Sequence, residues 1–267
     1  MKDNEKLTDQ NATQEASLSG EWRNFTEMKK YIRANKYDYN WLKDNWMGPN
    51  PLYLAEELCA NMDLRPGMKV LDMGCGKGCS SVFLAKEYGV TVFASDLWIS
   101  ATDNYKRFVE MGVSDRVFLI HAEAHTLPYA EEFFDAIISI DSYHYYWTND
   151  IFLHDFVKYL KPGGQIGIVV PGLKHEIGNN VPENIREYWD EGFCALHSPK
   201  WWEEHFKKCK SVKVDVADSP DDGWEIWLKW EILSKKYNNG NNDRYISLLE
   251  IDQGKTITFS RVISTKM

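Results

Sequence analysis

The stretch Val70-Leu71-Asp72-Met73-Gly74-Cys75-Gly76-Lys77-Gly78 joins a short apolar run to three glycines at alternate positions. Its apolar start predicts a buried parallel strand, and its glycines predict a tight turn where a ligand can approach the backbone closely. We expect a helix over residues 79–88, with its free N–H groups and positive dipole end directed at that ligand. This stretch therefore predicts the first strand, loop and helix of a nucleotide- or nucleoside-binding domain.

The spacing of the glycines favours one kind of ligand over another. A dinucleotide-binding loop reads G-x-G-x-x-G, whereas here Asp72 precedes glycines spaced as G-x-G-x-G. A carboxylate attracts an ammonium group and repels a pyrophosphate. The pattern resembles the first motif of the class I S-adenosylmethionine-dependent methyltransferases, whose cofactor carries an ammonium group at its methionine end.

Four further features resemble the same family and follow in the family's order. They are Asp96 after a predicted strand at 90–94, Glu123 followed by Leu127-Pro128, the apolar strand ending at Asp141, and the turn Leu160-Lys161-Pro162-Gly163-Gly164. A carboxylate about twenty residues past the glycines can accept hydrogen bonds from both hydroxyls of a ribose. Each feature alone is common, but their combination over residues 66–171 is hard to obtain by chance.

The resemblance implies both a fold and a cofactor. The expected fold is α/β and doubly wound, with a mainly parallel seven-stranded sheet, helices on both faces and an N-terminal helical lid. The implied cofactor is S-adenosyl-L-methionine, with S-adenosyl-L-homocysteine as its product. The residues expected around the cofactor are Asp72, Met73, Gly74, Cys75, Gly76, Asp96, Leu97, Trp98, Ala122, Glu123, Ala124 and Asp141.

Within this set the resemblance implies distinct roles. Asp96 would accept hydrogen bonds from the ribose, and Leu97 and Trp98 would flank the adenine ring. Glu123 would accept a hydrogen bond from the adenine amino group, where many relatives carry aspartate. Asp141 would contact the methionine end of the cofactor.

The loop over residues 141–147, here called the aromatic loop, should border the transferred methyl group because it leaves a strand beside the first one. His144 in this loop is the candidate base, since a histidine pKa can lie near neutrality, or else a structural residue of a packed loop. The candidate substrate-binding residues are Tyr39, Trp46, Tyr143, Tyr145, Tyr146 and Trp201. Aromatic faces suit an alkylammonium or a planar apolar acceptor, but aromatic side chains at helical spacing also build cores.

The chain reads as one domain with additions at both ends. Residues 1–19 are polar and predict a disordered tail, and residues 20–61 predict an N-terminal helical cap. The cap is either a moving lid or a fixed cover of the sheet edge. Residues 66–171 form the expected cofactor-binding core. Residues 172–267 should supply substrate-side helices, including 180–194 and 199–208, and the final strands.

Composition limits the possible partners. The formal net charge of −9 argues against nucleic acid, because phosphate binding needs a basic face. No run of eighteen apolar residues or signal-peptide core is present, so we expect a cytoplasmic protein without a membrane segment. The five cysteines lack the spacing of a zinc site, and we predict no metal. The sequence is also compatible with a homo-oligomer.

These observations predict an S-adenosylmethionine-dependent methyltransferase acting on a nitrogen or oxygen nucleophile of a small molecule by in-line displacement. An NAD-dependent oxidoreductase would share the glycine loop and Asp96, but it does not predict Glu123 or the Lys-Pro-Gly-Gly turn. A non-catalytic binding or scaffold protein on the same fold is the other alternative, because a fold alone does not determine a function.

Overall fold

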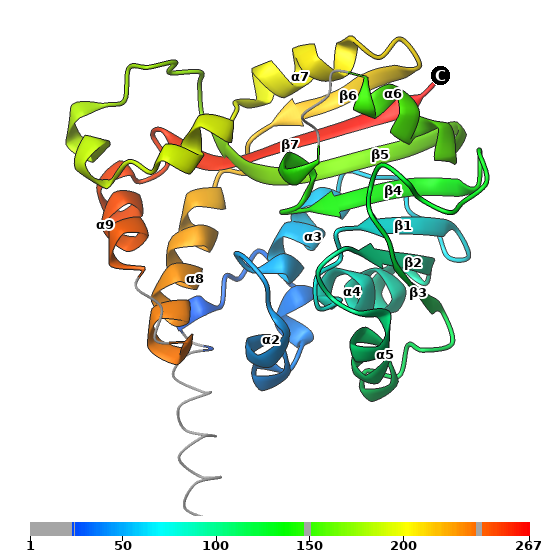
Figure 1. Cartoon of the computed structure of the whole chain (residues 1–267). Coiled ribbons are helices and arrows are strands. Elements are labelled where there is room, and N and C mark those ends of the chain that lie inside the picture. The colour runs from blue at the N-terminus through cyan, green and yellow to red at the C-terminus, as the bar shows by residue number, and fades with distance from the viewer. Residues whose placement is uncertain (1–22, 24, 147–150, 239–241) are drawn as a thin grey trace, which may run out of the picture.

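The computed structural model describes residues 23, 25–146, 151–238 and 242–267, so the predicted tail lies outside it (Figure 1). In these residues one seven-stranded sheet has the strand order β3-β2-β1-β4-β5-β7-β6. The strands are β1 (Lys69–Met73), β2 (Thr91–Asp96), β3 (Val117–His121), β4 (Phe134–Ile140), β5 (Leu160–Leu173), β6 (Val212–Asp218) and β7 (Ile257–Lys266). Only β7 runs antiparallel to its two neighbours. The predicted doubly wound, mainly parallel sheet is confirmed.

The strand order reverses between β1 and β4. β1 pairs with β2 on one side and with β4 on the other, both in parallel register. Ligands of doubly wound sheets bind outside the carboxyl ends of the strands, at such a reversal. The topology therefore brings the loops that follow β1, β2 and β4 to one place.

Helices cover both faces of the sheet (Figure 1). One face packs against α3 (Pro51–Cys59), α4 (Cys79–Tyr88) and α8 (Gly223–Asn238), and the other packs against α6 (Phe152–Phe156) and α7 (Pro199–Lys207). Alternate residues of β1 serve the two faces: Val70 belongs to the first core, and Leu71 and Met73 belong to the second. Burying an apolar side chain of this size contributes roughly 1.5–3 kcal/mol.

Glycines set both ends of α4, as the sequence predicts. Gly78 precedes the helix with φ +83°, and an added Cβ there would lie 2.4 Å from Phe108 Cε1. Gly89 ends the helix with φ +65°. Both backbone conformations are strained for residues that carry a Cβ atom, so the glycine positions determine where α4 begins and ends.

The described part of the cap contains a short 3₁₀ turn, η1 (Ala34–Lys36), the helix α2 (Tyr39–Asn45) and α3. It packs on the last third of the chain through polar contacts. The Tyr31 hydroxyl donates to Asp222 at 2.9 Å, and Arg261 of β7, only 7% exposed, pairs with Glu57 of α3 and with Asp218. Buried ion pairs of this kind hold their elements in one arrangement, because losing one partner leaves an uncompensated charge.

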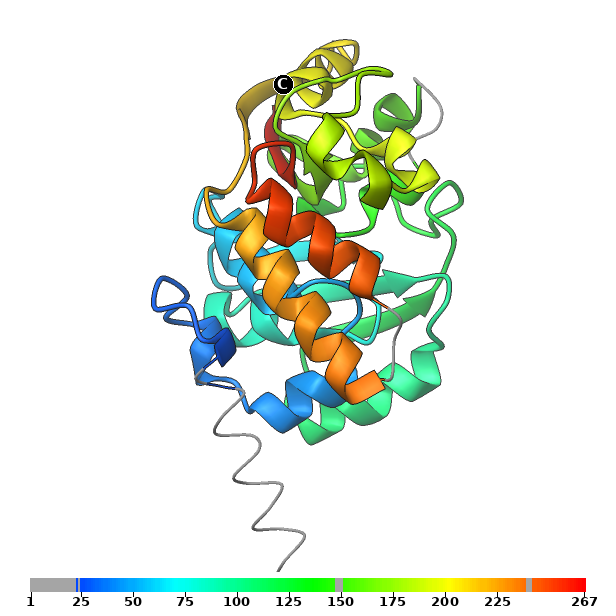
Figure 2. The ribbon, with the colours of Figure 1, turned by 90° about the vertical axis from the view of Figure 1, so that its left-hand side faces the viewer.

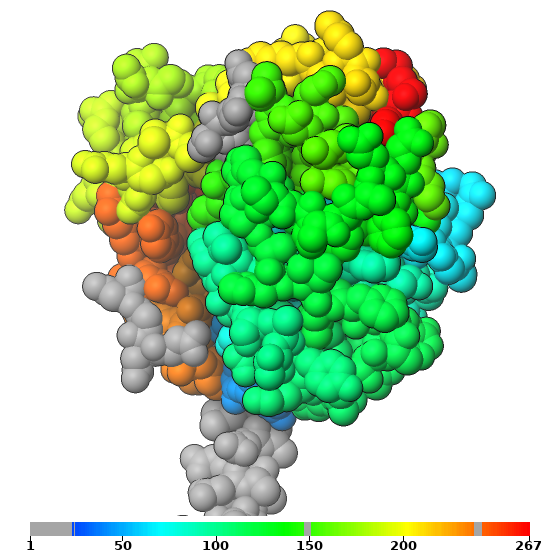
Figure 3. Space-filling view, turned by 45° about the vertical axis from the view of Figure 1, so that its right-hand side comes forward, coloured from blue at the N-terminus to red at the C-terminus, as the bar shows by residue number. Residues whose placement is uncertain are grey.

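Two further helices complete the molecule. α5 (Ala101–Glu110) packs beside β3, and α9 (Asp243–Asp252) lies against α8 (Figure 2). In the space-filling view of Figure 3, α8 and α9 form one side of the molecule, next to the green and teal surface of the cofactor-binding core.

Two expectations differ from the structure, and one helix was not expected. The helix expected over 180–194 is two 3₁₀ segments, η4 (Glu183–Tyr188) and η5 (Glu191–Ala195), because Asp190 is extended between them and its side chain accepts from Gly192 N. The Lys-Pro-Gly-Gly turn lies inside β5, whose pairing with β4 shifts register there. The sequence predicts no element at α9 (Asp243–Asp252). A polar loop expected over 238–242 falls mostly outside the described residues.

Candidate active site

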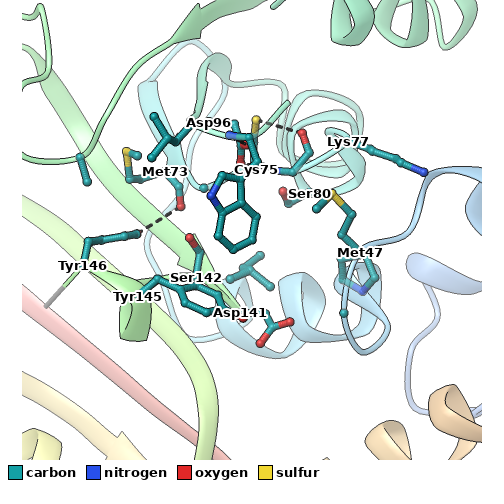
Figure 4. A pocket seen from close by; sticks show the side chains of 18 of the residues that line it. Met47, Met73, Cys75, Lys77, Ser80, Asp96, Asp141, Ser142, Tyr145 and Tyr146 are labelled. Carbon is teal, nitrogen blue, oxygen red and sulfur yellow. Dashed lines mark hydrogen bonds between the residues drawn. The ribbon is translucent and has the colours of Figure 1, made fainter. Parts of the chain in front are cut away.

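A cavity of about 400 Å³ opens at the carboxyl ends of β1, β2 and β4 (Figure 4). Its lining comes from five parts of the chain that lie far apart in sequence. They are the α2–α3 region of the cap (Asn45, Met47, Gly48, Pro51), the β1–α4 region (Met73–Lys77, Cys79, Ser80), the loop after β2 (Asp96–Trp98), the loop after β3 (Glu123–His125) and the loop after β4 (Ile140–Ser142, Tyr145, Tyr146). Its size lies within the range of small-molecule sites.

The glycine loop presents bare backbone to this cavity. Gly74 and Gly76 have φ values of +74° and +54°. An added Cβ would lie 1.8 Å from Ser142 Oγ at Gly74 and 3.1 Å from Met47 Sδ at Gly76. Neither position can carry a side chain without displacing a wall of the cavity.

Asp96 holds the loop against the end of β2. Its Oδ2 accepts from Gly76 N, and its Oδ1 accepts from the backbone N–H groups of Trp98 and Ile99, all at 2.8 Å. Each carboxylate oxygen has two acceptor sites, so Oδ2 retains one. The position suits a hydroxyl group of a ligand that lies along the glycine loop.

Asp72 does not line the cavity, in contrast to the expectation for it. It is fully buried beneath α4, where its Oδ2 accepts from Ser80 at 2.7 Å and from Ser81 at 2.6 Å. Burial raises its pKa to about 6 against the effect of the two hydroxyls. Within the described chain its Oδ1 has no hydrogen-bond partner. Asp72 supports the start of α4 from behind the loop, and Ala122 also lies outside the lining.

Glu123 lies on the cavity wall and is paired with His125. Its carboxylate accepts from the His125 backbone N at 3.0 Å and contacts the imidazole Nδ1. Partial burial alone would raise the pKa of Glu123, but the hydrogen bonds from His125 outweigh it and lower the pKa. An amino group of a ligand would compete with His125 for this carboxylate.

Asp141 follows β4 in a backbone conformation that is uncommon for a non-glycine residue, with φ +50°. Its backbone N donates to Val169 O at 2.8 Å, and its carboxylate lies directly over Gly48, where an added Cβ would be 1.9 Å from Oδ2. Burial raises its pKa to about 8, with a further contribution from the charge of Glu231. In the described residues no group donates a hydrogen bond to this carboxylate.

The predicted aromatic set divides into two groups. Tyr145 and Tyr146 line the cavity, and the Tyr146 hydroxyl contacts Ser139 Oγ at 2.6 Å and donates to Met73 O at 3.4 Å. The other four are packed elsewhere: Trp46 on Trp230, Tyr143 in the fully buried core, Trp201 between His197 and His205, and Tyr39 in the cap. These four are positioned as structural residues.

His144 also lies outside the lining, and its ring packs on Tyr145 with centroids 4.1 Å apart. Burial lowers its pKa to about 4, so the imidazole is neutral at pH 7. Its Nδ1 finds no partner among the residues that the structure describes. A role as base stays a prediction that this position does not favour.

The sequence did not predict the four residues of the cap that line the cavity, Asn45, Met47, Gly48 and Pro51. Asn45 accepts from Arg107 Nε through its side chain at 2.8 Å and from Cys79 Sγ through its carbonyl at 3.3 Å. Lys77 donates to Asp44 O at 3.1 Å, so the glycine loop and the end of α2 are joined (Figure 4). The Gly48-Pro49 pair after α2 is a sequence signal for a turn, but it does not say what the turn covers.

Comparisons with known proteins agree with this geometry. Residues 70–164 match a family model described as a methyltransferase domain. Methyltransferase GfsG of Streptomyces halstedii is 32% identical over 151 residues, covering 55% of this chain and 51% of that protein. Phosphoethanolamine N-methyltransferase 1 of Triticum aestivum is 35% identical over 112 residues, covering 42% of this chain and 22% of that protein. The chain thus spans about half, or less, of the length of these relatives.

A solved structure shares the fold. Phosphoethanolamine N-methyltransferase 2 of Haemonchus contortus, in complex with S-adenosyl-L-methionine, superposes with a TM-score of 0.64 at 20% identity, covering 92% of this chain and 60% of that one. The match over residues 70–164, the named relatives and the shared fold support a class I S-adenosylmethionine-dependent methyltransferase, and the Haemonchus contortus structure holds S-adenosyl-L-methionine. The bare glycine loop and the remaining acceptor site of Asp96 fit an adenosyl group. In the described part of the chain, no helix is long and apolar enough to cross a membrane.

Proposed function

We propose that this chain transfers the methyl group of S-adenosyl-L-methionine to a nitrogen or oxygen nucleophile of a small-molecule acceptor. The observation that carries the proposal is that one cavity joins the glycine loop and Asp96 to the loop after β4. A cofactor at the first end and an acceptor at the second would meet between them. The names of the relatives, which include phosphoethanolamine N-methyltransferases, support a small-molecule acceptor.

We assign the cofactor contacts to the lining residues predicted from sequence. Gly74 and Gly76 would face the cofactor with backbone groups, and Asp96 would accept from the ribose. Glu123 would accept from the adenine amino group, with Leu97, Trp98 and Ala124 around the ring. Met73 and Cys75 complete this wall of the cavity.

The chemistry asks little of the protein beyond position. The bound cofactor supplies a methyl group already activated by a positively charged sulfur. The chain therefore binds the acceptor in line with that methyl group and keeps water out, which accounts for much of the rate in such reactions. The joined contacts of Asn45, Arg107 and Lys77 close one side of the site for this purpose.

Calorimetric titration with S-adenosyl-L-methionine, S-adenosyl-L-homocysteine and NAD tests the proposal. We expect the first two to bind and NAD not to bind, and Asp96→Ala should weaken both by at least ten-fold. Asp115→Ala is the control, because this aspartate is exposed and pairs only with its neighbour Arg116. Binding of NAD alone would favour the oxidoreductase, and no binding of any of the three would favour the scaffold.

A further inference from the structure

We propose that the acceptor is an amine that binds as a cation at the Asp141 end of the cavity, where Asp141 holds the ammonium and then takes its proton. The proposal rests on the methyltransferase function proposed above and names the substrate class for the same site. It also excludes phosphate esters as good acceptors.

The first observation that supports the proposal is the position of Asp141. In Figure 4, Asp141 and Asp96 lie at opposite ends of the cavity, with Ser142 between them. A nucleoside held by Asp96 extends along the glycine loop toward Ser142, which lies over Gly74. The far end, beneath Gly48 of the cap, is then left for the acceptor.

The second observation is the set of charged side chains that line the cavity. Its acidic side chains are Asp96, Glu123 and Asp141, and Asp141 alone of these lacks a hydrogen-bond donor in the described residues. Lys77 is the one lysine or arginine of the described lining, and its ammonium donates to Asp44 O at the cap. A phosphate at the Asp141 end would meet a carboxylate and no basic partner, whereas an ammonium would pair with Asp141.

The third observation is an aromatic face beside Asp141. Tyr145 lines the cavity, is 59% exposed, and lies close enough to Asp141 that partial burial and the carboxylate charge together raise the tyrosine pKa. An exposed aromatic ring beside a carboxylate suits a bound alkylammonium group. A carboxylic or phosphoric acid would gain nothing from this ring.

The surroundings of Asp141 let it accept the proton. The titratable groups that face it are Glu231 of α8, whose Oε1 accepts from Trp227 Nε1, and the Tyr145 hydroxyl. Burial and the charge of Glu231 bring the pKa of Asp141 to about 8, so at pH 7 Asp141 is protonated in the empty site; an entering amine takes this proton and forms the ammonium–carboxylate pair. The ammonium proton passes to the carboxylate, and the freed nitrogen lone pair forms the N–CH₃ bond. The S–CH₃ bond breaks as this happens, and its electron pair stays on sulfur.

The test uses protein saturated with S-adenosyl-L-homocysteine, so cofactor binding is measured before the acceptor end is probed. Butylammonium, phenethylammonium, ethanolamine and phosphoethanolamine are then titrated in separately, with butyrate as the anionic counterpart of the first. We expect saturable binding of at least one of the three unphosphorylated cations. We expect weaker binding of phosphoethanolamine than of ethanolamine, and none of butyrate.

Asp141→Asn should weaken the cation at least ten-fold and leave the affinity for S-adenosyl-L-homocysteine unchanged. Asp44→Asn is the matched control, because it makes the same substitution at an exposed position of the cap. If Asp141→Asn no longer binds S-adenosyl-L-homocysteine, Asp141 is a cofactor-binding residue and the proposal is overturned. Absence of saturable cation binding, or a preference for phosphoethanolamine or butyrate, would also overturn it. If the unmodified protein does not bind S-adenosyl-L-homocysteine, the proposed function fails instead.

Discussion

Arg107 on α5 donates a hydrogen bond of 2.8 Å to the side chain of Asn45, which is 62 residues earlier at the end of α2. The same guanidinium donates through NH1 to Asn104, whose amide nitrogen donates to Gly76 O at 2.8 Å. The cap and the glycine loop are thus tied through one side chain of α5.

Arg107→Ala should loosen the cap over the cofactor site. We expect a loss of stability of about 2 kcal/mol, typical of a hydrogen bond from a charged group, and a several-fold weaker binding of S-adenosyl-L-methionine. Thermal unfolding and calorimetry would measure the two effects. Arg116→Ala, at an exposed position that pairs only with its neighbour Asp115, is the control for the loss of an arginine. Unchanged cofactor affinity in Arg107→Ala would mean that the cap does not shape this site.

Gly74→Ala tests the bare backbone of the glycine loop. Its Cβ would overlap Ser142 Oγ in addition to the strain of φ +74°, so we expect cofactor binding to be lost and stability to fall by roughly 2–3 kcal/mol. Gly163→Ala is a matched control, because Gly163 has φ +77° and nothing lies within 4 Å of an added Cβ. That variant should lose only about 1 kcal/mol. Equal losses in the two variants would contradict the close approach of Ser142.

The elevated pKa of Asp141 predicts a dependence of stability on pH. The folded protein retains a proton on Asp141 up to pH 8, whereas the unfolded chain releases it near pH 4. The stability from this group is therefore complete below pH 4 and is lost as the pH rises through 8. Asp141→Asn stays neutral, so its melting temperature relative to the unmodified chain should rise by roughly 10 °C between pH 5 and pH 8. A constant difference across this range would show that Asp141 ionises normally.

The position of His144 gives a prediction about catalysis. Its ring lies outside the cavity lining and is neutral above its lowered pKa of about 4. We expect His144→Ala to bind S-adenosyl-L-methionine with unchanged affinity and to retain its turnover rate within about three-fold. Loss of a catalytic base would instead lower the turnover rate by about 10²-fold or more. A drop in turnover of 10²-fold or more with unchanged cofactor binding would restore His144 as the base.

Arg261→Met tests the buried ion pairs between the cap and β7. The variant removes the buried partner of Glu57 and leaves only the half-exposed Lys30, so we expect a loss of about 1.5–3 kcal/mol in the free energy of unfolding, below that of a fully unpaired buried charge. Chemical denaturation would measure it. Lys200→Met is the control, because Lys200 pairs with Glu203 and Glu204 at an exposed position and should cost less than about 1 kcal/mol.

The sequence predicts the elements whose limits depend on single residues. The helix expected over 79–88 is α4, because Gly78 and Gly89 set its ends. The helix expected from Pro199 begins there, because Ser198 Oγ accepts from Trp201 N. The mainly parallel direction of the strands also follows, because long apolar runs separated by helices leave little alternative to a parallel sheet.

The parts that could not be predicted depend on contacts between distant segments. Asp72 and Asp96 are both acidic residues at the ends of strands, but α4 covers the first and leaves the second on the cavity wall. The six predicted aromatic residues divide between core and cavity according to which helix meets them, which local pattern does not reveal. Met47 and Gly48 enter the site only because the cap folds back over the glycine loop.

The contacts among Lys30, Tyr31, Glu57, Asp222 and Arg261 have a consequence for synthesis on the ribosome. The glycine loop and its neighbouring strands emerge early, but the partners that anchor the cap are translated near the end of the chain. Domains begin to fold as they emerge, so the cap first meets α4 and α5 and gains its buried ion pair only after β7 has left the exit tunnel. A chain released before Arg261 would contain every proposed cofactor-binding residue and the contacts of the cap with Arg107, Lys77 and Asp222, but it would lack the guanidinium that pairs with Glu57.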